Sequence, residues 1–149
     1  MTDGQVLRMA TNRPGGGDRC DLRLTNVPAI VDELTVVRRV VRRWAAAAEL
    51  SGEQVQDLEL AVYEALSNVL DHAYPARGGG VFDLHAVQDS DAVTVTVTDH
   101  GHWRPPANPA STLRGRGLSL IKKLATDFEL RLRPTGTVVW MRWSRHSAN

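Results

Sequence analysis

The sequence of 149 residues contains a single cysteine and no long apolar run. One thiol, Cys20, cannot form an internal disulfide, so the composition predicts a protein of the reducing cytoplasm. No segment approaches the ~18 apolar residues that a membrane helix needs, and the first residues lack the apolar core of a signal peptide. We therefore expect a cytoplasmic protein with no membrane partner.

A strong excess of one charge is also missing. The formal net charge of +1 argues against direct binding of nucleic acid. The 42% of hydrophobic residues can build one core without a disulfide or a structural metal. Residues 1–19 include the run PGGGD and show no apolar period, so we expect a flexible N-terminal arm followed by a single domain over residues 20–149.

Apolar spacing predicts two helices after a short edge strand at residues 20–26. Pro28 suits the first position of the first helix. The buried stripe of that helix is Ile30, Leu34, Val37, Val41, Trp44 and Ala48. Ser51 begins the second helix, and Gln54 completes a capping box. The second stripe is Val55, Leu58, Val62, Ala65, Val69 and Ala73.

The second half of the chain alternates between strands and one more helix. Residues 81–87 and 92–99 alternate apolar with polar side chains, as half-buried strands do. Residues 115–125 predict a helix led by glycine, and two strands flank the turn at residues 134–136. Strands outnumber crossovers, so the sheet should be mixed and mostly antiparallel. The predicted fold class is α/β (α+β): a two-layer sandwich with about three helices on one face.

A polar cluster ends the second helix, in the stretch EALSNVLDHAYP. At ~100° per residue, Glu64, Asn68 and Asp71 fall within ~60° of one another and flank the core stripe. His72 lies at the margin of this cluster and could shape a pocket. Such residues are costly to cluster unless water or a ligand satisfies them.

A carboxylate continues the apolar face of the strand at residues 92–99. Asp99 shares that face with three valines, and Gly101 follows at a point where backbone can approach a ligand. An adenine amino group is a suitable donor for such a carboxylate. The alternative is that Asp99 merely ends the strand and caps the turn.

Two glycines precede the apolar positions of the last helix. Gly115 and Gly117 lead into Leu118, with Arg116 between them. A glycine loop that feeds a helix presents free N–H groups and a positive dipole end to an anion. The spacing is that of neither a Walker A loop nor a dinucleotide fingerprint.

Together, EALSNVLDHAYP, TDHGHW and GRGLSLIKKL resemble the GHKL (histidine kinase-like) ATPase superfamily, and most closely its kinase-type anti-sigma factors. The resemblance covers about residues 20–143 and implies the GHKL ATP-binding fold with ATP and Mg²⁺ as cofactors. It makes Glu64 the general base and Asn68 the magnesium ligand. It assigns cofactor-binding positions to Asn68, Asp71, His72, Asp99, Gly101, Gly115, Arg116, Gly117, Leu118, Gly136 and Thr137.

Among these, the resemblance matches Asp99 and Gly101 with the adenine site. The phosphate-side lid corresponds to residues 115–117, and Gly136 and Thr137 match a late Gly-Thr pair near the adenine. Asp71 departs from the family pattern, because many relatives carry a basic or neutral polar residue there. A negative charge at this position opposes phosphate unless a metal ion or Arg116 offsets it.

The implied function is an ATP-dependent serine/threonine protein kinase that is also an anti-sigma factor. Its partners would be an alternative sigma factor, an anti-sigma factor antagonist protein that it phosphorylates, and a second copy of itself. Two alternatives stay open: a nucleotide-gated anti-sigma binding module without significant kinase activity, and a detached histidine-kinase catalytic domain. The plainest alternative is an α/β domain with no nucleotide site.

Two further patterns have two readings each. Arg38, Arg39, Arg42 and Arg43 lie off the buried stripe of the first helix and form either a solvated face or a surface for an acidic protein. His100 and His102 could join His72 and His85 in a zinc site, although no cysteine supports it.

Overall fold

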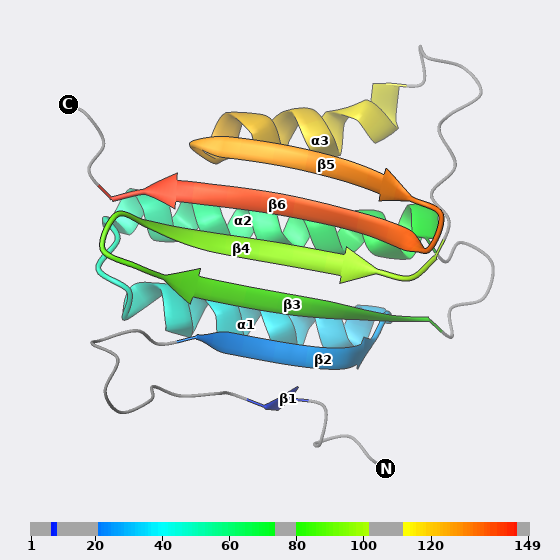
Figure 1. Ribbon diagram of the computed structural model, residues 1–149, viewed down its shortest axis with the longest axis horizontal. Helices are drawn as coiled ribbons and strands as arrows, with labels where there is room; N and C mark the ends of the chain where they lie inside the picture. Colours follow the sequence, from blue (N-terminus) through cyan, green and yellow to red (C-terminus); the bar gives the residue numbers. More distant parts are fainter. Residues whose placement is uncertain (1–6, 9–20, 74–79, 102–111, 146–149) are drawn as a thin grey trace.

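The computed structural model describes residues 7–8, 21–73, 80–101 and 112–145. In Figure 1 three helices lie behind one twisted sheet. In chain order the elements are β1 (Leu7–Arg8), β2 (Leu22–Pro28), α1 (Val31–Ala46), α2 (Gly52–Asn68), the π-helical turn η2 (Val69–Ala73), β3 (Val81–Gln88), β4 (Ala92–Asp99), α3 (Thr112–Leu124), β5 (Asp127–Arg133) and β6 (Gly136–Ser144). Among these helices, none is long and apolar enough to cross a membrane.

The two-layer α/β sandwich is confirmed, but every described strand pair is antiparallel. The sheet order is β1-β2-β3-β4-β6-β5. Two helices connect β2 to β3, so the chain returns to pair in the antiparallel direction. Only α3 connects β4 to β5, which makes these two strands parallel, but β6 lies between them. The predicted parallel pairing is therefore absent from the described sheet.

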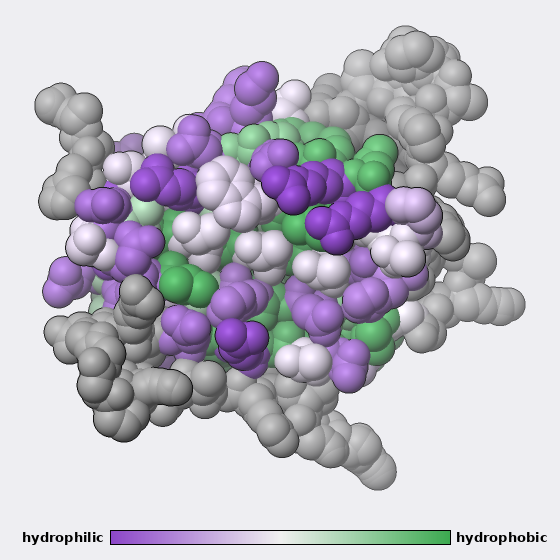
Figure 2. Space-filling view, viewed as in Figure 1, coloured by the Kyte–Doolittle hydropathy of each residue, from purple (hydrophilic) through white to green (hydrophobic). Residues whose placement is uncertain are grey.

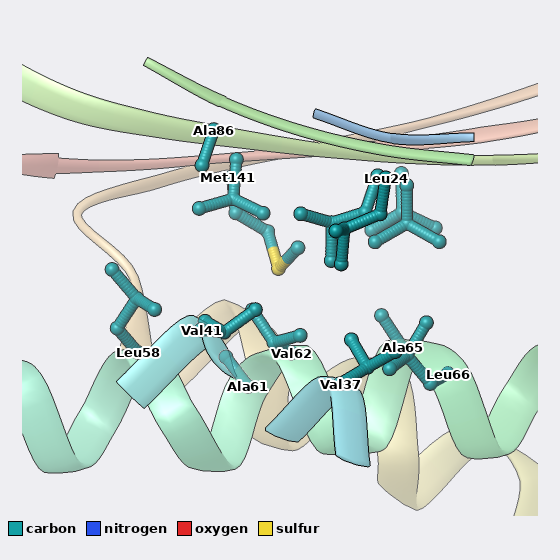
Figure 3. Close-up of a cluster of buried hydrophobic side chains, with 14 of the residues drawn as sticks. Leu24, Val37, Val41, Leu58, Ala61, Val62, Ala65, Leu66, Ala86 and Met141 are labelled. Carbon is teal, nitrogen blue, oxygen red and sulfur yellow. The ribbon is translucent and has the colours of Figure 1, made fainter. Parts of the chain in front are cut away.

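The core lies between the sheet and the helices. Figure 3 shows Leu24, Ala86 and Met141 of the sheet facing side chains of α1 and α2. The alternation predicted for β3 and β4 is confirmed, because Phe82, Leu84 and Ala86 and the valines of β4 are buried. The opposite face of the sheet carries mostly hydrophilic and neutral side chains, and no described helix covers it (Figure 2).

The start of α1 differs from the prediction. Pro28 is the last residue of β2, and the helix begins at Val31. Pro28 pairs with Val81, and the Ala29 N–H donates to the Gly80 carbonyl at 2.9 Å, so sheet pairing holds this segment extended. Ile30 becomes an extended N-cap residue that is 45% exposed, whereas the rest of the predicted stripe is buried.

The start of α2 follows the prediction. The Gln54 N–H donates to the Ser51 hydroxyl at 3.0 Å, and the Gln54 side chain accepts the Ser51 N–H at 3.1 Å. The same glutamine donates from its amide to the Ser144 carbonyl at 2.8 Å. The capping box thus also ties α2 to the end of β6.

A short N-terminal strand, β1, lies beside β2 at one edge of the sheet. Leu7 and Arg8, within the predicted N-terminal arm, pair with β2, so β2 is not a free edge along its whole length. The rest of that arm lies outside the described residues.

At the end of β6, Arg145 donates to carbonyls of Ala48 and Asp89. The pKa of the Asp89 carboxyl is lowered, chiefly because the backbone N–H groups of Asp91 and Ala92 donate to it, and nearby arginines add to the effect.

Candidate functional site

Among the described side chains, the buried polar or charged ones are Asn68, Asp99 and Thr137. They come from three elements: the end of α2, the end of β4 and the start of β6. Figure 1 shows these three points at the same end of the molecule, together with the start of α3. All three residues belong to the candidate set from the sequence. Buried polar groups need partners, so this end of the fold is suited to a polar ligand.

Asp99 lies on the helix-facing side of the sheet, as strand alternation predicted, and it is almost fully buried. Its Oδ1 accepts the N–H of Gly101 at 3.0 Å and the N–H of Thr137 at 3.2 Å. The first bond closes the turn after β4, and the second spans the β4–β6 pair in which Asp99 faces Thr137. These two donors orient the carboxylate. They are also the bonds expected if Asp99 ends the strand and caps the turn, so both interpretations of Asp99 stay open at this point.

Gly136 allows β6 to approach β4 at this point. Its φ is +150°, a conformation that other residues rarely adopt. A Cβ added there would lie 1.9 Å from the Asp99 carbonyl oxygen and 2.9 Å from the Cα of His100. No side chain can occupy that space. The Gly-Thr pair expected near the adenine therefore lies directly against the turn that holds Asp99.

The second part of the site is the end of α2. Asn68 is 6% exposed, and its Nδ2 has no hydrogen-bond partner within the described part of the chain. The two ends of an amide are distinguished only by their partners, and a half-turn of the side chain would bring the oxygen to the place that Nδ2 holds. Leaving such a buried group unpaired costs about 1–3 kcal/mol, which a ligand would recover. Glu64 lies one turn earlier and is half-buried.

The predicted clustering of Asp71 with these two residues is changed by η2. Residues 69–73 form a π-helical turn, whose i→i+5 bonds advance the chain by a smaller angle per residue than an α-helix. The prediction that grouped Asp71 with Asn68 assumed ~100° per residue, the value of an α-helix, as far as Asp71. Asp71 is exposed, whereas Asn68 is buried. His72 is also in η2, and its side chain lies outside the described residues.

The glycine motif occupies a different place from the one predicted. α3 begins at Thr112, so Gly115, Arg116 and Gly117 lie inside the helix and not in a loop before it. Glycine within a helix costs about 1 kcal/mol relative to alanine but does not prevent helix formation. The Arg116 side chain lies outside the described residues, whereas Leu118 is half-buried against the core. The free N–H groups of α3 belong to the turn that starts at Thr112.

His85 and His100, whose side chains the structure describes, each approach a separate carboxylate. His85 Nε2 lies 3.4 Å from Asp21, and His100 Nε2 lies 3.3 Å from Asp83. Within the described ranges, no group of three His, Cys, Asp or Glu side chains could hold a metal ion. His102 lies outside them.

One residue beside the site was not predicted from the sequence. The second oxygen of Asp83 accepts the backbone N–H of Asn26 at 2.8 Å, so Asp83 connects the turn after β4 to β2. Asp83 is an ordinary outward-facing residue of β3, and no sequence signal marks this role.

Comparison with known proteins places this geometry in a family. Residues 27–143 match the histidine kinase-like ATPase domain. The serine-protein kinase RsbW of Halalkalibacterium halodurans is 35% identical over 119 residues, which covers 70% of this chain and 72% of the relative. The anti-sigma F factor of Lysinibacillus sphaericus is 30% identical over 73 residues, which covers 49% of this chain and 50% of the relative.

Two solved structures share the fold. The RsbU and RsbW domains of a Mycobacterium tuberculosis protein superpose with a TM-score of 0.64 at 21% identity, over 84% of this chain and 33% of that one. The blue-light activated histidine kinase of Erythrobacter litoralis gives a TM-score of 0.56 at 21% identity, over 79% of this chain and 42% of that one. The chain thus spans less than half of either solved chain. With most of its length matched, this chain belongs to the histidine kinase-like ATPase domain family.

Proposed function

We propose that the chain is an ATP-binding anti-sigma factor with serine/threonine protein kinase activity toward an anti-sigma factor antagonist. The observation that carries the proposal is the set of buried polar groups, Asn68, Asp99 and Thr137, gathered at one end of the fold. The similarity to a serine-protein kinase and to an anti-sigma factor supports it. The further partners are an alternative sigma factor and a second copy of the chain, and the setting is the cytoplasm.

The adenine is assigned to Asp99. Its carboxylate is held by two backbone donors and can accept the exocyclic amino group of the base. Gly101 carries no side chain beside Asp99, which leaves room for the base, and the lack of a side chain at Gly136 lets β6 lie directly against the Asp99 turn. A guanine presents a carbonyl oxygen at the corresponding position, which the carboxylate would repel. The proposal therefore includes selectivity for adenine over guanine.

The phosphates and the metal ion are assigned to the helix ends. Asn68 fits a magnesium site, because its buried Nδ2 lacks a partner among the described residues, and a half-turn of the amide would place there the oxygen that Mg²⁺ accepts as a ligand. When bound, Mg²⁺ would neutralise charge on the phosphates. The first turn of α3 and Arg116 are assigned to the phosphates, since a helix N-terminus attracts anions. Asp71 is exposed, so water and salt screen the repulsion between its carboxylate and the phosphates.

Glu64 is assigned as the general base. It lies one turn before Asn68 on α2, and its half-buried position leaves the carboxylate accessible to an incoming hydroxyl. It would take the proton from a serine or threonine of the antagonist as that oxygen attacks the γ-phosphate. The test is transfer of radiolabelled phosphate from ATP to the antagonist. If the wild type transfers none to an antagonist that it binds, the nucleotide-gated binding module replaces the kinase.

Replacing Asp99 by asparagine is expected to weaken ATP binding by about 2–3 kcal/mol. The amide keeps the size of the side chain but can turn a donor toward the adenine amino group, and it loses the charge that the two N–H groups support. Titration calorimetry measures the change. Asp91→Asn is the matched control, because Asp91 is an exposed carboxylate in the β3–β4 turn. Equal ATP affinity in Asp99→Asn and wild type would remove the adenine assignment.

The arginines of α1 divide into two pairs in the structure. Arg38 Nε lies 2.8 Å from Glu59 on α2, and its guanidinium stacks 5.0 Å from the Tyr63 ring centre. Arg42 Nε lies 3.7 Å from the same glutamate. Arg39 and Arg43 are exposed, one helical turn apart. A partner surface on α1 is therefore assigned to Arg39 and Arg43, and the first pair joins α1 to α2.

Reversing both charges, Arg39→Glu with Arg43→Glu, is expected to weaken capture of the sigma factor by about tenfold or more at low salt. The reason is repulsion of an acidic partner surface. ATP binding should stay unchanged, because Arg39 and Arg43 lie in the second half of α1, whereas only the start of that helix is at the site end of the fold (Figure 1). Lys122→Glu with Lys123→Glu on α3 is the control, since it changes the net charge equally at exposed positions. Equal capture by both double variants and wild type would make Arg39 and Arg43 a solvated face.

A further inference from the structure

The helix-facing side of the sheet is built from rows of side chains that cross the strands. Two rows are entirely apolar: Ala86, Val95, Met141 and Phe128, and Leu84, Val97, Val139 and Leu130. The next row is Phe82, Asp99, Thr137 and Leu132. This row holds the two buried polar residues of the sheet, and it is the row nearest the site end of the fold (Figure 1).

Exposure increases along β5 toward this row. Phe128 and Leu130 are partly buried against the core, whereas Leu132, two residues further, is 57% exposed. Leu132 faces the same side of the sheet as these two residues, because side chains alternate along a strand. A single exposed leucine is ordinary on a protein surface. What distinguishes Leu132 is that it continues the row of Asp99 and Thr137 beyond the cover of the helices.

We infer that Leu132 forms an apolar part of the nucleoside subsite, where it contacts the adenosine portion of the nucleotide. Adjacent strands lie ~4.8 Å apart, so Leu132 is two strand spacings, or roughly 10 Å, from Asp99 with Thr137 between them. A base that donates to Asp99 and extends over Thr137 is directed along this row. The flat apolar face of a base is matched by an aliphatic side chain, which loses water when the ligand binds.

This inference rests on the proposed function, and it assigns Leu132 a role separate from that of Asp99. Asp99 selects the base through a hydrogen bond, whereas Leu132 adds apolar contact to the nucleoside and none to the phosphates. The two roles predict different losses. A Leu132 variant should weaken adenosine and ATP by the same factor and leave inorganic tripolyphosphate unaffected.

The experiment is titration calorimetry of the full chain with adenosine, ATP and tripolyphosphate. Leu132→Gln is expected to raise the Kd of adenosine and ATP by about tenfold, and Leu132→Met is expected to retain most of the affinity. Val36→Gln is the control, because Val36 is an apolar residue of α1 that is 37% exposed. Thermal unfolding checks that all variants keep the stability expected of a surface change.

The outcomes separate the proposed function, which is ATP binding, from the role assigned to Leu132. If wild type binds neither adenosine nor ATP, the proposed function fails. If wild type binds both and Leu132→Gln binds them equally well, the proposed function stands and the role of Leu132 is overturned. It is also overturned if Leu132→Gln weakens tripolyphosphate by the same factor, or if Val36→Gln loses as much affinity.

Discussion

Replacing Glu64 by glutamine is expected to slow phosphate transfer to the antagonist by ~10²–10⁴-fold while ATP still binds. Glutamine keeps the size and most of the hydrogen-bonding capacity of glutamate but cannot accept the proton of the attacking hydroxyl. Glu64 is half-buried on α2 and is not one of the residues assigned to bind the adenine or the metal ion. The loss should therefore affect the transfer rate and not the affinity.

Asn68→Ala is the matched comparison on the same helix. It removes the buried amide assigned to the metal ion, so magnesium-dependent ATP affinity and phosphate transfer should fall together. Radiolabelled transfer run beside a nucleotide-binding assay separates the two variants. Glu64→Gln should hold the sigma factor and the nucleotide but leave the antagonist unmodified.

Transfer at the wild-type rate in Glu64→Gln would show that another group takes the proton. Asp71 is the next candidate, because it follows Asn68 on η2 and is exposed. The π-helical turn points Asp71 in a different direction from the one that an α-helix predicts, which makes it the weaker candidate. A rate that falls only in Asp71→Asn would transfer the role of general base to that residue.

The sequence predicted best those features that depend on local periodicity. The valine and threonine alternation of β4 placed Asp99 on the buried face, and it is buried. The Ser51 and Gln54 pair formed the predicted capping box, because both bonds lie within four residues of chain. In both cases the prediction depends only on residues that are close together in the sequence.

The features that the sequence did not predict depend on contacts between distant segments. Pro28 suits a helix start, but its pairing with Val81, more than 50 residues later, holds it in β2. No apolar period in the sequence shows that α3 begins three residues before Gly115. None shows that the α-helix changes to a π-helix after Asn68. The register that aligns Leu132 with Asp99 likewise depends on three strands pairing together.

Gly136 is the position where the structure leaves least room for change. Gly136→Ala is expected to lower the free energy of unfolding by about 2 kcal/mol or more and to weaken ATP binding. The new Cβ would lie 1.9 Å from the Asp99 carbonyl oxygen, an atom of the backbone that cannot turn aside as a flexible side chain can. The backbone at φ +150° is also strained for alanine.

The overlap can be relieved only if the start of β6 moves away from the end of β4. That movement lengthens the bond from the Thr137 N–H to Asp99 Oδ1, which is already 3.2 Å long. The carboxylate assigned to the adenine then loses the Thr137 N–H as a donor. Stability and nucleotide affinity should therefore fall together, unlike in Asp99→Asn, where the backbone is unchanged.

Gly52→Ala is the matched control, since a Cβ at Gly52 would meet no atom within 4 Å. Gly52 is the first residue of α2, where alanine is the better helix former, so stability should be unchanged or raised by up to ~1 kcal/mol. Urea unfolding followed by circular dichroism gives both stabilities, and calorimetry gives the ATP affinity. Gly136→Ala could instead have the same unfolding midpoint and ATP affinity as Gly52→Ala. That result would mean that β6 does not press on the Asp99 turn. It would also contradict the proposal that the Thr137 N–H helps to hold the Asp99 carboxylate for the adenine.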